Sequence, residues 1–253
     1  MKKTALTIIC IILCTNLGAQ DSRQVELTAQ EILARVDEVM KYPTGELQGD
    51  IMHIFPDGKS VNFRLEGNIG KEDYIFTFSS PRRGKQLRVL YNLYGEDIWV
   101  YNLLSLKLFH KVDVDKYDPL LDSNFNFLDL SNADFQSNYT SKIIKTSTYK
   151  GKSVIILSLD PIFKGGEYGK LTLYVVRKDY IPMRIDYHDQ DRVITKTLTI
   201  AKIAQFNNRT FPVRYDMLHI SSGTLTILQF NDYDGNMNYP KTMFRHEQLS
   251  TID

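Results

Sequence analysis

The 253-residue chain is nearly free of cysteine: its two cysteines, Cys10 and Cys14, both lie in the first twenty residues. If that stretch is removed during export, the mature chain can form no disulfide, use no catalytic thiolate and bind no metal through sulfur. Each cysteine follows a bulky residue, Ile9 or Leu13, where a bacterial lipobox has a small one. We therefore expect no lipid anchor, and a lipid-anchored form remains the alternative.

The first twenty residues have the pattern of a cleaved secretory signal. Two lysines precede an apolar run over 5–13, and Gly18-Ala19 supplies small residues before a cleavage point. The run is too short to cross a bilayer as a stable helix. We predict a signal peptide over 1–19 and one domain over 20–253, located in a bacterial periplasm.

Neither sign of charge is in excess. Lys and Arg total 31 and Asp and Glu total 30, so the formal net charge is +1. Loss of the signal removes two lysines and no acid, which leaves −1. This balance gives no electrostatic footprint for nucleic acid or for an anionic membrane surface. The mature length of about 234 residues suits one large all-β domain.

Motifs for catalysis and metal binding are missing or incomplete. The chain has no G-x-S-x-G elbow, and its five histidines are widely spaced. The sequences at 58–60 and 151–153 both read Gly-Lys-Ser, but neither has the earlier glycine of a phosphate-binding loop. Two acidic clusters, 113–118 and 186–191, do not combine the bend glycine and the bidentate Glu of a calcium loop. We expect no enzyme, no cofactor and no metal site.

One segment has a clear helical pattern. Thr28 and Glu31 form a capping box, and Tyr42-Pro43-Thr44-Gly45 ends the helix. Between them, the apolar residues at spacings of three and four are Ile32, Leu33, Val36, Val39 and Met40. The sequence therefore predicts one amphipathic helix at the start of the domain.

Most of the remaining chain alternates apolar and polar residues, with turn sequences about every ten residues. The alternating segments are 61–65, 74–78, 87–93, 98–101, 104–112, 153–159, 171–176, 183–187, 193–200, 212–220 and 224–230. This pattern predicts a mainly β (α+β) domain of about 10–12 antiparallel strands, a large meander curled on itself.

Some strands carry large apolar residues on both faces: Trp99 and Tyr101 alternate with Ile98 and Val100. A sheet needs this where each face meets something apolar, such as a helix or lid on one side and a ligand space on the other. The alternative is that aromatic residues have a high strand propensity.

The stretch FNFLDLSNADFQSNY, residues 125–139, concentrates apolar side chains without a regular period. Asp, Asn and Ser interrupt it, as they do in turns and short capped helices. Two interpretations remain open. The stretch is either a fixed plug of the core, or a movable lid over an apolar cavity.

Four segments, taken in order, carry a recognisable pattern. They are 78–87, 97–101 with Leu104 and Lys107, 125–139, and 184–189 with Lys196. The pattern resembles the LolA/LolB-like carriers of outer-membrane lipoproteins, in particular their lipoprotein-sorting branch, over about 28–249. One departure lies at 124–126, where the chain has Asn in place of an expected Gly.

The resemblance implies a half-open antiparallel β-barrel, with helices across its mouth and an apolar cavity for acyl chains. An acyl chain costs about 0.8 kcal/mol per CH₂ in water, so a carrier needs a dry surface rather than reactive groups. The cargo would be an acylated lipoprotein or lipid, with transient contacts to membrane donor and acceptor proteins and none to nucleic acid. An envelope sensor or protein-binding module on the same fold is the alternative function.

The residues expected to line the cavity come from the helix, the strands and the aromatic stretch. They are Ile32, Val36, Met40, Phe63, Tyr74, Phe76, Phe78, Trp99, Tyr101, Phe125, Phe127 and Leu128. Because a shift of one residue turns a strand side chain to the other face, the strand members of this set depend on the register.

Overall fold

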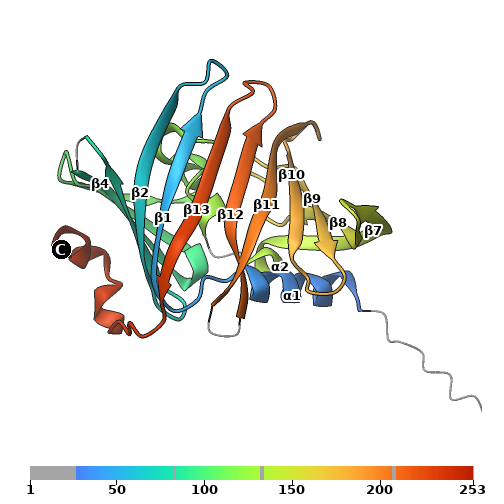
Figure 1. Ribbon diagram of the computed structural model, residues 1–253, viewed down its shortest axis with the longest axis horizontal. Helices are drawn as coiled ribbons and strands as arrows, with labels where there is room; N and C mark the ends of the chain where they lie inside the picture. The colour runs from blue at the N-terminus through green and yellow to red at the C-terminus, as the bar shows by residue number, and fades with distance from the viewer. Residues whose placement is uncertain (1–26, 83, 132–133, 207–208, 253) are drawn as a thin grey trace, which may run out of the picture.

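The computed structural model describes residues 27–252, except 83, 132, 133, 207 and 208. The predicted signal peptide over 1–19 lies outside the described residues. Within them, the strands form one antiparallel sheet of 13 strands that curls without closing (Figure 1). The expected mainly β, half-open architecture is confirmed, with one strand more than the upper expected number.

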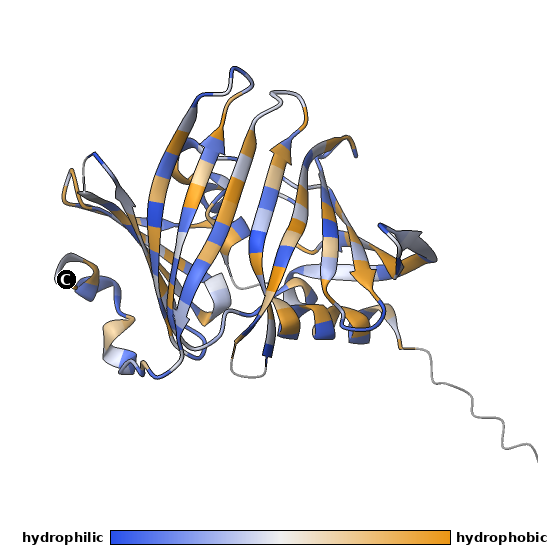
Figure 2. Ribbon diagram, in the orientation of Figure 1, coloured by the Kyte–Doolittle hydropathy of each residue, from blue (hydrophilic) through white to orange (hydrophobic). Residues whose placement is uncertain are grey.

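The sheet joins two runs of strands at one seam. Strands that follow each other along the chain pair side by side, except β6 and β7, which form the two edges of the sheet. β1 also pairs with β13. The strands are β1 Gly45–Ile54, β2 Ser60–Ile69, β3 Tyr74–Ser80, β4 Gly84–Asn92, β5 Asp97–Asn102, β6 Lys107–Lys111, β7 Tyr139–Tyr149, β8 Lys152–Pro161, β9 Lys170–Val176, β10 Pro182–His188, β11 Ile194–Phe206, β12 Arg209–His219 and β13 Leu225–Asp234. Figure 2 shows apolar and polar residues alternating along them.

Helix α1 (Ala29–Met40) lies across one end of the curled sheet (Figure 1). Its capping box is formed as expected, with Thr28 N donating to Glu31 Oε2 at 2.7 Å and Glu31 N to Thr28 Oγ1 at 3.2 Å. At its other end the Arg209 guanidinium donates to the carbonyls of Glu38 and Lys41 and so joins the helix to β12. Across the described ranges, no helix has the length and apolar character of a membrane span.

The chain between β6 and β7 passes through the hollow of the sheet. We call residues 112–131 the crossing segment; it contains the short 3₁₀ helices η2 (Asp113–Tyr117), η3 (Leu120–Asp122) and η4 (Leu128–Leu130). The four-residue helix α2 (Phe135–Asn138) then leads into β7. The buried apolar side chains of the segment, which pack into the same core as the inner face of the sheet, are Leu120, Phe125, Phe127 and Leu130.

The C-terminal residues after β13 cover part of the outer face of the sheet. Phe244 and Leu249 pack with Ile75 and Leu90 there, and Trp99 and Tyr101 lie against this cluster. The Arg88 guanidinium donates to the Leu249 carbonyl at 2.8 Å. The second apolar face of β5 therefore meets the chain's own C-terminal residues.

Trp99 is stacked between two imidazole rings on this outer face. Its ring lies 4.0 Å from that of His110 on β6 and 4.2 Å from that of His246, in the 3₁₀ helix η6 (His246–Ser250). Its Nε1 donates to Asp97 at 2.8 Å. The tryptophan thus fastens the C-terminal residues to the edge of the sheet.

Candidate functional site

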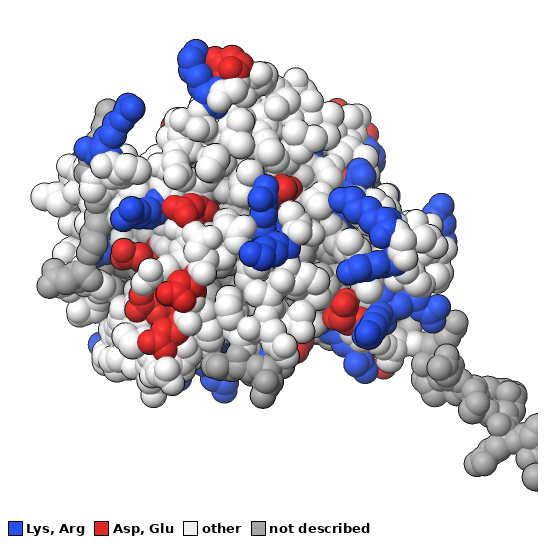
Figure 3. Space-filling view, in the orientation of Figure 1, with Lys and Arg blue, Asp and Glu red and all other residues white. Residues whose placement is uncertain are grey.

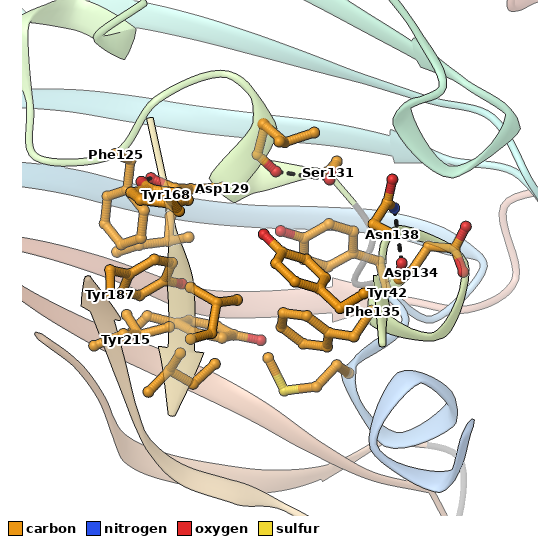
Figure 4. Close-up of a pocket in the computed structure, with 17 residues that line it drawn as sticks. Tyr42, Phe125, Asp129, Ser131, Asp134, Phe135, Asn138, Tyr168, Tyr187 and Tyr215 are labelled. Atoms are coloured by element: carbon orange, nitrogen blue, oxygen red, sulfur yellow. Dashed lines mark hydrogen bonds between the residues drawn. The ribbon is translucent and has the colours of Figure 1, made fainter. Parts of the chain in front are cut away.

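A cavity of about 80 Å³ lies between the end of α1, the crossing segment, α2 and the inner face of β9–β13 (Figure 4). Its lining is mostly aromatic and aliphatic. The lining residues are Met40, Tyr42, Phe125, Leu128, Asp129, Ser131, Asp134, Phe135, Asn138, Tyr139, Tyr168, Leu171, Ile185, Tyr187, Leu198, Tyr215 and Leu228.

Helix α2 forms the mouth of this cavity. Asn138 is exposed and Tyr139, the next residue, is buried, so the lining passes from solvent to interior at this point. The helix is held by Asp37 of α1, whose carboxylate accepts from Phe135 N at 2.8 Å and Gln136 N at 2.9 Å. Burial raises the pKa of Asp37 to about 7, although both backbone bonds favour its ionised form.

The cavity is much smaller than an acyl chain. A cavity needs about 10–15 Å³ of space open to a water-sized sphere to hold one water molecule, so 80 Å³ has room for only a few waters. The rest of the hollow is filled by the apolar side chains of the crossing segment. Any longer ligand would therefore have to displace this segment.

Asn124 attaches the crossing segment to the turn between β12 and β13. Its Nδ2 donates to the carbonyls of Met217 and Thr224, both at 2.8 Å. Its backbone N donates to Thr226 Oγ1 at 2.9 Å, and its Oδ1 accepts from Thr224 Oγ1 at 2.8 Å. A glycine, expected here from the resemblance, could make only the backbone bond.

Three tyrosine hydroxyls hold the backbone of the segment from the opposite side. Tyr91 donates to the Phe127 carbonyl at 3.0 Å, and Tyr74 and Tyr42 donate to the Leu130 carbonyl at 3.3 and 3.4 Å. Burial raises the pKa of Tyr42 and Tyr91, so these hydroxyls stay protonated and remain donors.

Asp129 is the acid of a polar cluster beside the cavity. It accepts from the Tyr168 hydroxyl at 2.9 and 3.0 Å and from Asn126 N at 3.0 Å. Lys196 Nζ lies 3.3 Å from the same hydroxyl and 2.9 Å from Glu167 Oε1. Burial, opposed by the nearby Lys196 charge and by the bond from Asn126, raises the pKa of Asp129 from 3.8 to about 6.

This shift predicts a pH dependence of stability. In the folded protein Asp129 holds a proton that the unfolded chain releases near pH 4, so its contribution to the free energy of unfolding falls as the pH rises from about 4 to about 6. We expect Asp129→Asn to remove that part of the decline. Urea unfolding of both proteins at pH 4, 5, 6 and 7 measures it, and parallel curves would contradict the assignment.

Three of the twelve residues expected at the cavity line it: Met40, Phe125 and Leu128. The other nine lie elsewhere. Those in the main core, at the helix, on β2 and β3 and in the crossing segment, are Ile32, Val36, Phe63, Tyr74, Phe76, Phe78 and Phe127. Those on the outer face, beside the C-terminal residues, are Trp99 and Tyr101.

The sheet wall of the cavity comes from the C-terminal run of strands, which sequence reasoning did not select. Its members on β9–β13 are Leu171, Ile185, Tyr187, Leu198, Tyr215 and Leu228. Residues two apart on a strand share a face, so the pair Ile185/Tyr187 was the available signal. The sequence does not say which run of strands faces the cavity.

Comparison with protein families assigns most of the chain to one family. A family model described as "Uncharacterized protein" matches residues 70–251. The chain belongs to this family. No curated protein matches it.

Several solved structures share the fold of this family member. One is described as an outer membrane lipoprotein-sorting protein domain from Vibrio parahaemolyticus (TM-score 0.77, 19% identity, covering 88% of this chain and 98% of that one). A LolA superfamily protein from Nitrosomonas europaea gives 0.72 at 21% identity, covering 88% and 100%. A DUF1329 family protein from Desulfovibrio piger gives 0.74 at 18% identity, covering 87% and 97%. The chain therefore has a LolA-like fold, as its sequence motifs indicate.

Proposed function

We propose that the protein is a periplasmic carrier that binds the acyl chain of a lipoprotein or lipid in the hollow now filled by the crossing segment. The observation that carries the proposal is that apolar side chains of the crossing segment occupy the hollow of the sheet. The apolar wall of the sheet is covered by a connecting segment attached through hydrogen bonds at Asn124, Asn126 and Asp129. An acyl chain takes the place of that segment when the segment swings outward.

A strained turn near the middle of the crossing segment supports such a movement. Leu121 and Asp122 have φ angles of +53° and +55°, in the left-handed region. This conformation costs a residue other than glycine roughly 1–2 kcal/mol. The closed position is therefore strained at this turn, and we expect opening to release that strain.

The free energy needed to expose the crossing segment is similar in size to the free energy gained by burying an acyl chain. Exposing the four buried apolar side chains of the crossing segment costs about 1.5–3 kcal/mol each, or roughly 6–12 kcal/mol together. A chain of twelve methylene groups gains about 10 kcal/mol on leaving water. Binding is then close to balanced, which suits a carrier that must also release its cargo.

The proposal extends to location and chemistry. Residues 1–19 direct export, residues 20–253 form one domain in the periplasm, and the protein acts by binding without catalysis. Membrane donor and acceptor proteins contact it transiently.

Phe135→Asp tests the proposal. Phe135 lines the cavity from α2, outside the crossing segment, so it stays in place when the segment moves. It is half-buried, so the fold can accept an aspartate there, and the aspartate places a charge against the acyl chain. We expect affinity for a fluorescent fatty acid to fall at least tenfold, measured by titration. Native mass spectrometry of protein purified from its host should also show a bound acyl species in the wild type.

Leu108→Asp is the matched control. Leu108 is 40% exposed on the edge strand β6 and is not part of the cavity lining, so its replacement should leave fatty-acid binding unchanged. Equal affinities of wild type and Phe135→Asp, or equal losses in both variants, would overturn the carrier function.

A further inference from the structure

The near-neutral charge of the whole chain conceals an uneven distribution. Residues 139–178, which span β7, β8 and β9, contain eight Lys or Arg and two Asp or Glu. Figure 3 shows blue side chains gathered over this end of the molecule with little red among them. This end of the sheet therefore has a positive surface.

Exposed apolar side chains lie within the same region. Ile143 and Ile144 on β7 are 46% and 55% exposed, and Ile162 and Phe163 after β8 are 58% and 49% exposed. Successive residues of a strand normally point to opposite faces, but the register with β8 shifts between Ile143 and Lys145. This bulge on an edge strand exposes two consecutive isoleucines, and edge bulges commonly re-aim side chains in this way.

Both apolar pairs lie on the β7–β8 edge of the sheet, where Ile143 pairs with Leu157 and Tyr139 pairs with Pro161 beside the second pair. Ile162 N donates to the Asn138 carbonyl at 2.9 Å, which places the loop after β8 against the mouth. Asp160, at the end of β8 before this loop, is paired with Arg192, whose Nη1 donates to its Oδ1 at 2.8 Å. The pKa of Asp160 is lowered first by this bond and, to a smaller extent, by the charges of Lys142 and Lys164.

The opposite edge of the sheet has apolar residues without this charge. Leu104, Leu106 and Phe109 are 56%, 71% and 46% exposed around β6. Residues 97–118, however, contain three Lys and four Asp. Apolar exposure alone does not distinguish the two edges, but charge does.

We infer that the surface formed by Ile143, Ile144, Ile162 and Phe163, with Lys142 and Lys164, docks onto an anionic phospholipid membrane. The isoleucines and the phenylalanine enter the headgroup layer, and the lysines pair with lipid phosphates. Docking in this orientation turns the cavity mouth at Asn138 toward the bilayer. The inference rests on the proposed carrier function for its purpose, since an acyl chain could then pass between cavity and membrane without crossing water.

Vesicle sedimentation tests the docking. The full mature chain is mixed with vesicles of phosphatidylglycerol and phosphatidylcholine at about 1:2, and separately with phosphatidylcholine alone. We expect binding to the anionic vesicles that is at least tenfold tighter than to the neutral ones and that weakens as salt is raised. Equal binding to both vesicle types, or no binding to the anionic ones, would overturn the inference.

Single substitutions identify the surface. Ile144→Asp and Phe163→Asp should each weaken vesicle binding at least fivefold, because each adds a repelling charge and removes an inserting side chain. Leu106→Asp is the matched control at the other edge and should bind as the wild type does. If Leu106→Asp lost vesicle binding and Ile144→Asp kept it, docking would take place at the β6 edge, and the proposal would be refuted.

Fatty-acid titration separates this inference from the proposed function. Ile144 is not part of the cavity lining, so Ile144→Asp should take up the fluorescent fatty acid normally. A wild-type protein that binds anionic vesicles but no fatty acid would refute the carrier function and leave the docking surface standing. Uptake of fatty acid without vesicle binding would refute the docking surface alone.

Discussion

Gly49→Ala is expected to lower the free energy of unfolding by about 4 kcal/mol, a large part of the roughly 5–15 kcal/mol that stabilises a typical domain. Gly49 pairs with Phe230 where β1 joins β13. A Cβ atom at this position would lie 2.3 Å from the Gln229 carbonyl oxygen and 3.1 Å from the Phe230 Cα. Both atoms are backbone, and β13 is fixed on its other side by β12, so neither can move away. Urea unfolding followed by circular dichroism measures the loss.

Gly58→Ala is the matched control, since it makes the same chemical change in the turn between β1 and β2. Gly58 has a φ of +81° and nothing lies within 4 Å of its added Cβ. We expect Gly58→Ala to lower the free energy of unfolding by only about 1–2 kcal/mol, through backbone strain. If both variants unfolded at the same urea concentration, steric exclusion at the seam would not be the reason for glycine at position 49.

Asn124→Ala should be the second most damaging change, at about 2–3 kcal/mol. It removes three side-chain hydrogen bonds, including the amide bond to the Met217 carbonyl, while the Thr224 carbonyl still accepts from His219 N at 2.9 Å. Each buried polar group left unsatisfied costs about 1–3 kcal/mol. Asn68→Ala is the control, because its amide makes one bond, to the Tyr239 hydroxyl, on the outer face. We expect Asn68→Ala to lower the free energy of unfolding by about 1 kcal/mol.

The same variant distinguishes a movable lid from a fixed plug. If the crossing segment must leave the hollow before cargo enters, weakening its attachment at Asn124 should speed the uptake of a fluorescent fatty acid in stopped-flow mixing. Asn68→Ala should take up the probe at the wild-type rate. Lower stability of Asn124→Ala without faster uptake would show that the segment is a permanent plug.

Local sequence signals were sufficient for most of the fold. The capping box and apolar stripe located α1, and alternation located eleven of the strands. The two missed strands are β1 and β7. β1 contains Gly45 and Gly49, which weaken a strand pattern although close approach to β13 requires them. β7 is an edge strand whose lysines and exposed residues conceal its alternation.

The site was less accessible to prediction because it depends on contacts between distant segments. The apolar outer face of β5 suggested a ligand, but the partner is the C-terminal cluster around Phe244 and Leu249. No local pattern reveals that a strand is covered by residues more than a hundred positions later. Overall charge was equally uninformative, since a net value near zero cannot show that lysines collect on β7–β9.

Pairing of β1 with β13 also sets when the fold can be completed. Gly49 and its partner Phe230 are about 180 residues apart, so β1 can find its final neighbour only after almost the whole chain has emerged into the compartment where it folds. Until then two incomplete half-sheets each offer a bare edge, so the protein depends on whatever keeps the emerging chain from associating with other copies of itself.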